Sequence, residues 1–150
     1  MKKLSLIALT ALTAFAALPA AAQFQKPEDA IKYRKAAFTV MAAHFSRVAG
    51  MAAGKIPFDA ATAAANAEIA TSMAKLPFAA FIDGTSTGDT KSKPEIWTER
   101  AKFDAAASKM QEEIVKLNVA AKSGNLDAIK AGVGATGKAC KACHDDFRKE

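Results

Sequence analysis

Two cysteines and a histidine near the end of the sequence have types and a spacing that indicate a defined chemistry. They stand in the run Cys140–His144, which reads Cys-Lys-Ala-Cys-His. Residues three apart on a helix are neighbours, with about 5–6 Å between their Cβ atoms. Two thiols at that spacing can form thioethers with the vinyl groups on one side of a porphyrin, and the following imidazole then lies toward the iron. The run has the attachment pattern of c-type haem and predicts covalent haem c with His144 as the iron ligand.

Three other interpretations of the cysteine pair are weaker. A thioredoxin-like pair belongs to a βαβ context, whereas this pair follows helical patterns. A zinc site with two cysteines and His144 lacks an obvious fourth ligand, because the only other histidine is His44. A structural disulfide is open to an exported chain. Haem attachment is favoured because bacterial c-type haem is attached in the compartment to which an export signal delivers the chain.

The first 22 residues have the pattern of such an export signal. A basic start, an apolar stretch up to Leu18 and a small-residue end fit a secretory signal peptide. The stretch is short for a bilayer span, which needs about 20 residues. We therefore expect cleavage after Ala22, a periplasmic location and one mature domain, residues 23–150.

The charge pattern does not favour a nucleic-acid-binding surface. The formal net charge of the chain is +6, and it falls to +4 when the two lysines of the signal peptide are removed. Nucleic-acid sites gather Lys and Arg into a dense stripe, whereas here they are scattered among 15 acidic residues. An acidic docking partner is compatible with this charge, but the sequence does not identify a redox partner.

Four segments repeat apolar residues at helical spacing and must position the haem motif. They run over about 27–53, 57–76, 94–123 and 126–150. With short connections between the first two and the last two, they predict an all-α fold, an antiparallel (up-down-up-down) four-helix bundle that holds a cofactor between facing helices. The buried face of the second helix is predicted from its apolar residues, which are Phe58, Ala61, Ala65, Ile69, Met73 and Leu76.

Local signals refine these boundaries. Pro27 suits a first helical position, Ser92 and Glu95 have capping-box spacing, and Asn125 can cap the fourth helix. The loop over 77–93 is long for a bundle connection, which favours a functional role. Three glycines on the fourth helix each cost up to ~1 kcal/mol, and we expect them to allow close approach to a neighbouring helix or to the porphyrin edge: Gly132, Gly134 and Gly137.

With these features the chain resembles cytochrome c′, a high-spin c-type cytochrome, over essentially the whole mature sequence. Cytochrome c′ is itself a known up-down-up-down bundle. The resemblance implies one covalent haem c, five-coordinate iron, reversible binding of NO and CO, gas handling or protection against nitrosative stress, no enzymatic turnover, and a homodimer through the first two helices. It rests on residues 26–30, Tyr33-Arg34, Gly88-Asp89, 94–97, 114–117 and 140–148.

The resemblance also implies roles for residues around the iron. Phe38, four residues after Arg34, would cover the open iron face and gate access of NO or CO, whose binding then weakens the His144 bond. Arg34 lies on the apolar stripe of its helix, where an arginine is costly unless paired, and a haem propionate is a natural partner. The other haem-lining residues implied are Lys35, Asp89 and Arg148, the last beside the proximal imidazole.

A protein ligand in the sixth position would change the function. Met41 is the better candidate because it lies on the core stripe of the first helix, whereas His44 lies about 120° around from that stripe and is expected to be exposed. With Met41 bound, the protein would be a low-spin electron-transfer cytochrome. An NO reductase ranks last, because the sequence shows no acid–base pair or substrate cleft.

Overall fold

The computed structural model describes residues 23–150, so the expected signal peptide lies outside the described residues. Within that range, none of the helices is long and apolar enough to cross a membrane. The elements in chain order are α1 Pro27–Ala52, α2 Ala60–Met73, the 3-10 turn η2 Leu76–Ala80, α3 Glu95–Thr98, α4 Arg100–Lys122 and α5 Leu126–Phe147.

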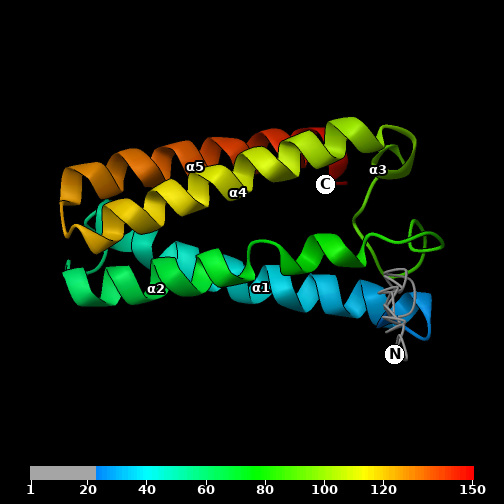
Figure 1. Cartoon of the computed structure of the whole chain (residues 1–150), viewed down its shortest axis with the longest axis horizontal. Coiled ribbons are helices and arrows are strands. Elements are labelled where there is room, and N and C mark those ends of the chain that lie inside the picture. Colours follow the sequence, from blue (N-terminus) through cyan, green and yellow to red (C-terminus); the bar gives the residue numbers. More distant parts are fainter. Residues whose placement is uncertain (1–22) are drawn as a thin grey trace, which may run out of the picture.

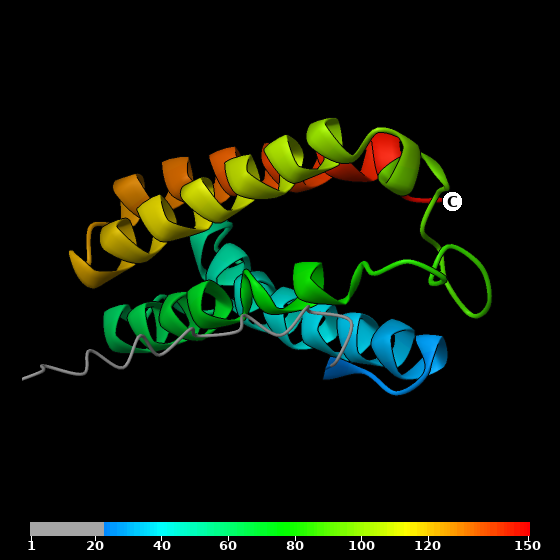
Figure 2. The ribbon, with the colours of Figure 1, turned by 45° about the vertical axis from the view of Figure 1, so that its right-hand side comes forward.

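The four long helices form an antiparallel bundle, as the sequence predicts. Figure 1 shows α1 and α2 along one side and α4 and α5 along the other, with each long helix running opposite to the one before it. α4 packs against both α5 and α2, and α1 packs against α2 and η2. The loop after η2, the short helix α3 and the C-terminus lie at the same end of the bundle (Figure 2). That end also carries the run Cys140–His144, in the last two turns of α5.

Several helix ends follow the signals in the sequence. Pro27 opens α1, where its missing N–H costs no intrahelical bond. Asn125 caps α5, because its side-chain oxygen accepts two 3.0 Å hydrogen bonds from backbone N–H groups of the first turn. Gly54 and Gly124 follow α1 and α4 with a φ of 68° at each, a left-handed conformation that glycine adopts without strain.

The second helix begins later than the pattern predicts. It starts at Ala60 instead of Pro57. Asp59 caps it, since the Asp59 carboxylate accepts a hydrogen bond of 2.6 Å from the backbone N–H of Thr62. This hydrogen bond lowers the pKa of Asp59. The cap fixes the helix start three residues after the proline.

The predicted buried face of α2 is wrong. Phe58, Ile69 and Leu76 are 37%, 39% and 38% exposed, and Ala61 and Ala65 are exposed as well. The residues that α2 buries are small ones on another face: Ala63, Asn66, Ala67 and Ala70. Small side chains let α2 lie close against α1 and α4. Of the larger apolar residues predicted for this face, Met73 is half-buried and packs against buried residues, whereas Ile69 and Leu76 remain on the outer surface.

The third predicted helix is divided in two. α3 and α4 are separated at Glu99, whose φ of −116° and ψ of 44° are not helical. The predicted capping box is wrong: no side chain caps α3, and Ser92 Oγ instead accepts from Thr90 Oγ1 at 2.9 Å. Trp97 on α3 donates its indole N–H to the Ile82 carbonyl at 3.1 Å. This hydrogen bond ties α3 to the preceding loop.

Three clusters of buried side chains follow one another along the bundle. The closed-end cluster, far from the cysteines, consists of Val48, Met51, Ala63, Ala67, Leu117, Ala121 and Ile129. The middle cluster consists of Met41, Ala70, Ala74, Met110 and Ile114. The aromatic cluster, near the C-terminus, consists of Phe81, Ile96, Phe103 and Phe147.

One of the three glycines of α5 allows the close approach expected of it. A Cβ atom on Gly132 would lie 3.2 Å from the backbone Cα and 3.1 Å from a side-chain methyl of Leu117. An alanine there would therefore push α5 away from α4. At Gly134 and Gly137 a Cβ would meet nothing within 4 Å. Close approach to a neighbouring helix is thus confirmed for Gly132 and wrong for the other two, while approach to a porphyrin edge stays a prediction.

Candidate functional site

The two cysteines lie on the face of α5 that packs into the bundle. Cys140 packs against the middle cluster and Cys143 against the aromatic cluster. Both thiols are free and half-buried, and their i, i+3 spacing places them side by side along the helix. His144, the next residue, is exposed. The last two turns of α5 thus present two thiols toward the interior and an imidazole at its margin.

The surroundings favour the uncharged forms of these three groups. Burial raises the pKa of Cys140, and it raises that of Cys143 to about 11 with smaller contributions from Cys140 and Asp146. Burial of part of the His144 ring lowers its pKa, the positive charge of Arg148 lowers it further, and Asp145 opposes both. A neutral imidazole is the form that binds iron. His144 is therefore favoured in the form that ligation needs, and both thiols are kept protonated.

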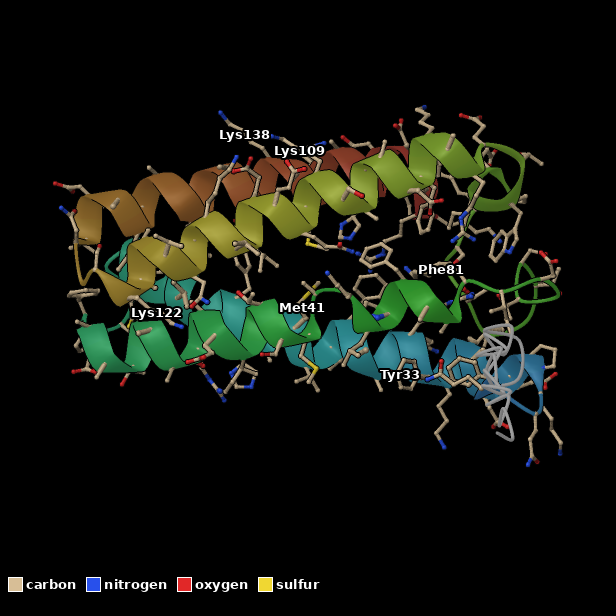
Figure 3. All side chains as sticks on the ribbon, in the orientation of Figure 1. Tyr33, Met41, Phe81, Lys109, Lys122 and Lys138 are labelled. Atoms are coloured by element: carbon tan, nitrogen blue, oxygen red, sulfur yellow. The ribbon has the colours of Figure 1, made fainter. Side chains whose placement is uncertain are left out.

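Phe38 lies on α1 between the two clusters that hold the cysteines. It is half-buried and packs against both the middle and the aromatic cluster. Its ring meets that of Phe78 edge-on, with 5.5 Å between centroids, and that of Phe81 at 6.3 Å. Figure 3 shows Phe81 in the space between η2 and α4. A phenyl group therefore stands on the α1 side of the bundle, level with the cysteines.

Of the two candidate sixth ligands, only Met41 lies in the same cluster as a cysteine. It is 7% exposed and belongs to the middle cluster, against which Cys140 packs. His44 is half-buried rather than exposed as expected, because its Nδ1 lies 2.8 Å from Asn66 Oδ1 on α2. Asn66 donates its amide to the Thr62 carbonyl, so its Oδ1 is an acceptor and His44 the donor. This hydrogen bond orients His44 toward α2.

Arg34 is buried, as its place on the stripe predicts, and its observed partners are oxygens of the last residue of η2 and of the loop after it. It is 2% exposed. Its Nη1 donates to Thr85 Oγ1 at 2.8 Å and to the Ala80 carbonyl at 3.3 Å. Its Nη2 donates to the Thr85 carbonyl and to Thr90 Oγ1, both at 2.8 Å. The guanidinium also lies 4.5 Å from the centre of the Phe81 ring. Burial lowers the pKa of Arg34 to about 10.

The Arg34 contacts engage all four N–H groups of the two terminal nitrogens, which leaves Nε–H as the donor for any further acceptor. A haem propionate therefore stays a predicted partner, and would be an additional one. Sequence reasoning missed the loop partners because hydroxyl and carbonyl oxygens in a loop leave no periodic signal.

The remaining predicted residues occupy two places at the same end of the bundle. Lys35 and Asp89 form an ion pair of 2.5 Å, with both side chains exposed. Arg148, directly after α5, lines an open recess of about 660 Å³ that also includes His144 and Lys93. The structure thus brings Arg148 close to the imidazole and Lys35 to Asp89. Thr85, Thr90 and Lys93 were not predicted, and only the length of their loop pointed to them.

The residues around the cysteines fit a haem. Besides two thiols at the right spacing and a neutral imidazole, they include an unpartnered buried hydroxyl. Thr136 is one turn before Cys140, is 0% exposed, and its Oγ1 has no hydrogen-bond partner in the described residues. Gly137, three residues before Cys140, leaves open space, because a Cβ there would meet nothing within 4 Å. Apolar walls with a few polar groups are typical of cofactor sites in bundles.

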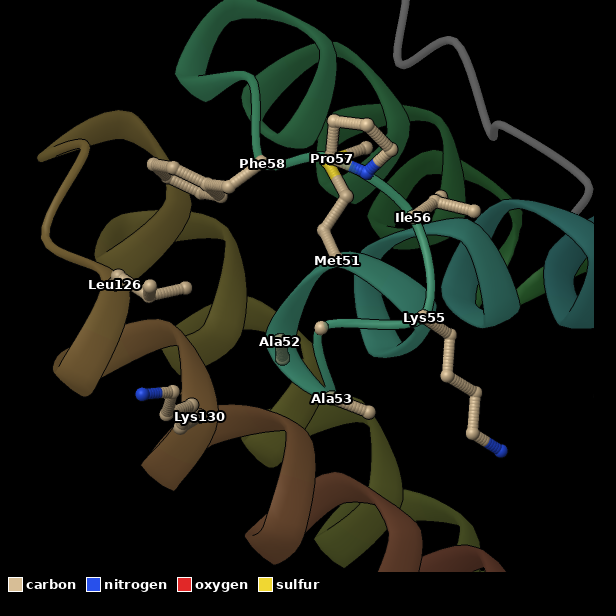
Figure 4. A pocket seen from close by; sticks show the side chains of 10 residues that line it. Met51, Ala52, Ala53, Lys55, Ile56, Pro57, Phe58, Leu126 and Lys130 are labelled. Atoms are coloured by element: carbon tan, nitrogen blue, oxygen red, sulfur yellow. The ribbon is translucent and has the colours of Figure 1, made fainter.

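A second hollow lies at the other end of the bundle. It measures about 540 Å³ and lies between the loop after α1 and the start of α5 (Figure 4). Its lining is mostly apolar, and Lys55 and Lys130 are its titratable residues. It contains neither cysteine nor histidine, so it is separate from the candidate haem site.

Taken together, an antiparallel four-helix bundle with a Cys-x-x-Cys-His run on its last helix defines a c-type haem protein of the helical-bundle class. The family model described as Cytochrome C' matches residues 29–148, and the chain belongs to that family. Haem c is the cofactor of this family, and the two cysteines fit its attachment. Proteins of the family are generally periplasmic haem proteins.

The relatives are similar along nearly their whole length. The chain is 52% identical to cytochrome c′ of Rubrivivax gelatinosus over 129 residues, which are 85% of this chain and all of the relative. It is 48% identical to that of Alcaligenes xylosoxydans xylosoxydans, of which it covers 99%. The crystal structure of the Rubrivivax gelatinosus protein matches with a TM-score of 0.82. Cytochrome c prime from Shewanella frigidimarina, 41% identical over 85% of this chain and 99% of that one, also gives 0.82.

Proposed function

We propose that this protein is a periplasmic haem protein with five-coordinate, high-spin iron that binds NO and CO reversibly, in gas handling or protection against nitrosative stress, without enzymatic turnover. In this proposal Cys140 and Cys143 hold the haem by thioether bonds and His144 is the fifth iron ligand. When bound, the haem would supply an iron that can bind a diatomic gas.

The observation that carries the proposal is the position of Phe38. Its ring packs against both cysteine-bearing clusters, and a phenyl group offers no atom that can ligate iron. Such a side chain excludes water and anions from an open axial position by its size and lack of polarity. It can rotate aside for a small neutral gas, because its edge-on neighbours hold it by weak aromatic contacts.

The relatives support gas binding as the function. Nitric oxide complexes are known for variants of cytochrome c prime from Alcaligenes xylosoxidans in which a leucine is replaced. These structures match this chain with a TM-score of 0.80 at 46% identity, over 85% of this chain and about 99% of theirs. We propose the same class of ligand for this chain.

One observation favours a second candidate function, electron transfer. The Met41 side chain is buried in the cluster against which Cys140 packs, and a thioether is a suitable sixth ligand. If Met41 bound iron, the protein would be low-spin and slow to bind CO.

Optical and EPR spectra of the purified ferric and ferrous protein, with and without CO, distinguish the two functions. High-spin spectra and a rapid shift with CO support the open iron, whereas a low-spin spectrum abolished by Met41→Ala supports electron transfer. Phe38→Ala should bind CO about tenfold faster, which equals ~1.4 kcal/mol off the barrier. The matched control is Phe45→Ala on the same helix, because Phe45 packs against the closed-end cluster and should leave the rate unchanged.

We assign the other residues to the margin of this site. Arg34 Nε–H would bond a propionate, the Lys35–Asp89 pair would line the haem edge, and Arg148 would act on the proximal side. These assignments are supported by the location of all four residues at the cysteine end of the bundle. Substituting each by alanine and titrating the haem potential would test them, and an unchanged potential in Arg34→Ala would count against the propionate contact.

Export and dimerisation complete the proposal. We propose that residues 1–22 are removed after Ala22, which the mass of the periplasmic protein would test.

The large apolar residues left exposed on α1, α2 and η2 support a homodimer through these elements: Val40, Ile69 and Leu76. Ile69→Glu should then give a monomer in analytical ultracentrifugation. Val119→Glu, which changes a 67% exposed valine of α4, should leave the protein dimeric. If the Ile69→Glu protein is still a dimer, this interface is refuted.

A further inference from the structure

The last turn of α5 receives unusual support from a residue of the distant loop. The final four carbonyls of an α-helix have no intrahelical partner. Two of them, those of Phe147 and Asp145, accept hydrogen bonds from Lys93. The backbone N–H of Lys93 donates to Phe147 at 3.0 Å, and its Nζ donates to Asp145 at 2.7 Å. Lys93 therefore caps α5 from another part of the chain, and Asp145 directly follows His144.

The contact extends over several residues on both sides. The backbone N–H of Lys149 donates to the Lys91 carbonyl at 2.8 Å, and Ser92 and Arg148 form an antiparallel bridge. Residues 90–93, here called the strap, therefore run alongside the segment that continues α5. An ammonium at a helix C-terminus is also favoured by the helix dipole. The strap thus adds to the hydrogen bonds with which α5 ends.

The other end of the strap is fixed to α1. The buried Arg34 donates from Nη2 to Thr90 Oγ1 at 2.8 Å. Thr90 Oγ1 in turn donates to Ser92 Oγ at 2.9 Å and accepts from the Ser92 backbone N–H at 3.1 Å. Because Arg34 is 2% exposed and held by four hydrogen bonds, it is a rigid anchor. Hydrogen bonds thus fix the strap to α1 at Thr90 and to the end of α5 at Lys93 and Lys91.

We propose that the strap positions His144, and that Lys93 is the residue that holds the last turn of α5 in place. The inference rests on the proposed role of His144 as iron ligand. A fixed last turn keeps the imidazole directed at the iron, so loss of the Lys93 cap lets the turn fray and weakens the bond from His144. Lys93 is a positioning residue: it acts through the carbonyl next to His144 and not on the ligand.

The test compares the haem-loaded protein with Lys93→Met, which keeps the length of the side chain and removes its donor. Backbone amide exchange at Arg148 and Lys149 should become about tenfold faster, as expected when a hydrogen bond from a charged group is lost from a local opening equilibrium. The iron–histidine stretching band of the ferrous protein should move to lower frequency. A larger fraction of the NO complex should lose His144, as read by EPR.

Two further variants keep the comparison decisive. Lys91→Met changes a neighbouring lysine whose part in the strap is its backbone carbonyl, so it should exchange as the wild type does. Lys93→Arg should restore most of the protection, because it keeps a cationic donor. If exchange and the stretching band of Lys93→Met match those of Lys91→Met, the strap does not position His144. If the wild-type protein carries no haem, the proposed function fails, while the exchange comparison still decides the role of Lys93.

Discussion

The two ends of the bundle are held together in different ways. At the closed end the core is aliphatic and rich in alanine, and Gly132 brings α5 to within contact of the Leu117 backbone. At the cysteine end, rings of Phe81, Phe103 and Phe147 form the core, with a buried arginine among them. In place of small side chains, the cysteine end packs aromatic rings, and the centroid of Phe103 lies 4.8 Å from that of Phe81 and 5.3 Å from that of Phe147.

The connections between the helices also differ between the two ends of the bundle. At the closed end, short turns with a left-handed glycine join the helices. At the cysteine end, a long loop is fixed by the side chain of Arg34 and by Lys93. The closed end thus has a close contact between two helix backbones, at Gly132 and Leu117, whereas the cysteine end is joined through the loop. We infer that the closed end fixes the bundle and the cysteine end adapts to a planar cofactor.

The largest expected effect is the loss of covalently held haem when the two thiols at the cysteine end are removed. The double variant Cys140→Ala/Cys143→Ala should lose all covalently held haem, because no thiol is left to form a thioether. Extraction with acidified acetone followed by an absorption spectrum of the protein fraction measures this. Lys141→Ala, inside the same run, should keep its haem. Haem that resists extraction from the double variant would refute attachment at these cysteines.

A smaller effect is expected at the closed end. Gly132→Ala should lower the free energy of unfolding by about 1–3 kcal/mol, since its Cβ would lie 3.2 Å from the Leu117 Cα and 3.1 Å from a Leu117 methyl, closer than ordinary van der Waals contact. Gly134→Ala, two residues away with open space at its Cβ, should raise it by up to ~1 kcal/mol. Guanidinium unfolding of the haem-loaded proteins measures both. Equal stabilities would contradict the tight packing of α4 on α5.

The smallest effect is expected in the middle of α4, away from both ends. Glu113 is 7% exposed and accepts hydrogen bonds from Lys109 and Lys116 at 2.8 and 2.9 Å. These bonds lower its pKa below the ordinary 4.5. The carboxylate therefore stabilises the fold above about pH 4.5, and this stability is lost as the pH falls through the lower folded value.

Glu113→Gln should accordingly lower the midpoint of unfolding at pH 7, and this deficit should shrink as the pH is lowered from 4.5. Glu112→Gln, at the adjacent exposed glutamate, is the matched control and should change little over the same pH range. A deficit of Glu113→Gln that stays constant as the pH is lowered would show that packing of the side chain, and not its charge, is what matters.

Much of the fold could be predicted because its signals are local. The period of the apolar residues identifies the four long helices, and Pro27, Gly54 and Asn125 mark ends that the structure confirms. Prediction failed where the neighbouring helices decide which face of a helix is buried. Ile69 and Ala63 are both apolar, and only the proximity of α1 and α4 selects the alanine for burial. The break at Glu99 was likewise not predicted, and it lies beside a contact between distant segments, the hydrogen bond from Trp97 to the Ile82 carbonyl.

The sequence by itself determined the chemistry: the spacing of Cys140, Cys143 and His144 on one helix follows from chain geometry alone, and so does the bundle that carries them. Only the tertiary structure decided what surrounds that run. Arg34 meets loop oxygens about 50 residues away in the sequence, and Lys93 reaches the end of α5. Hydrogen bonds between distant segments depend on how the helices pack, and no local pattern encodes them.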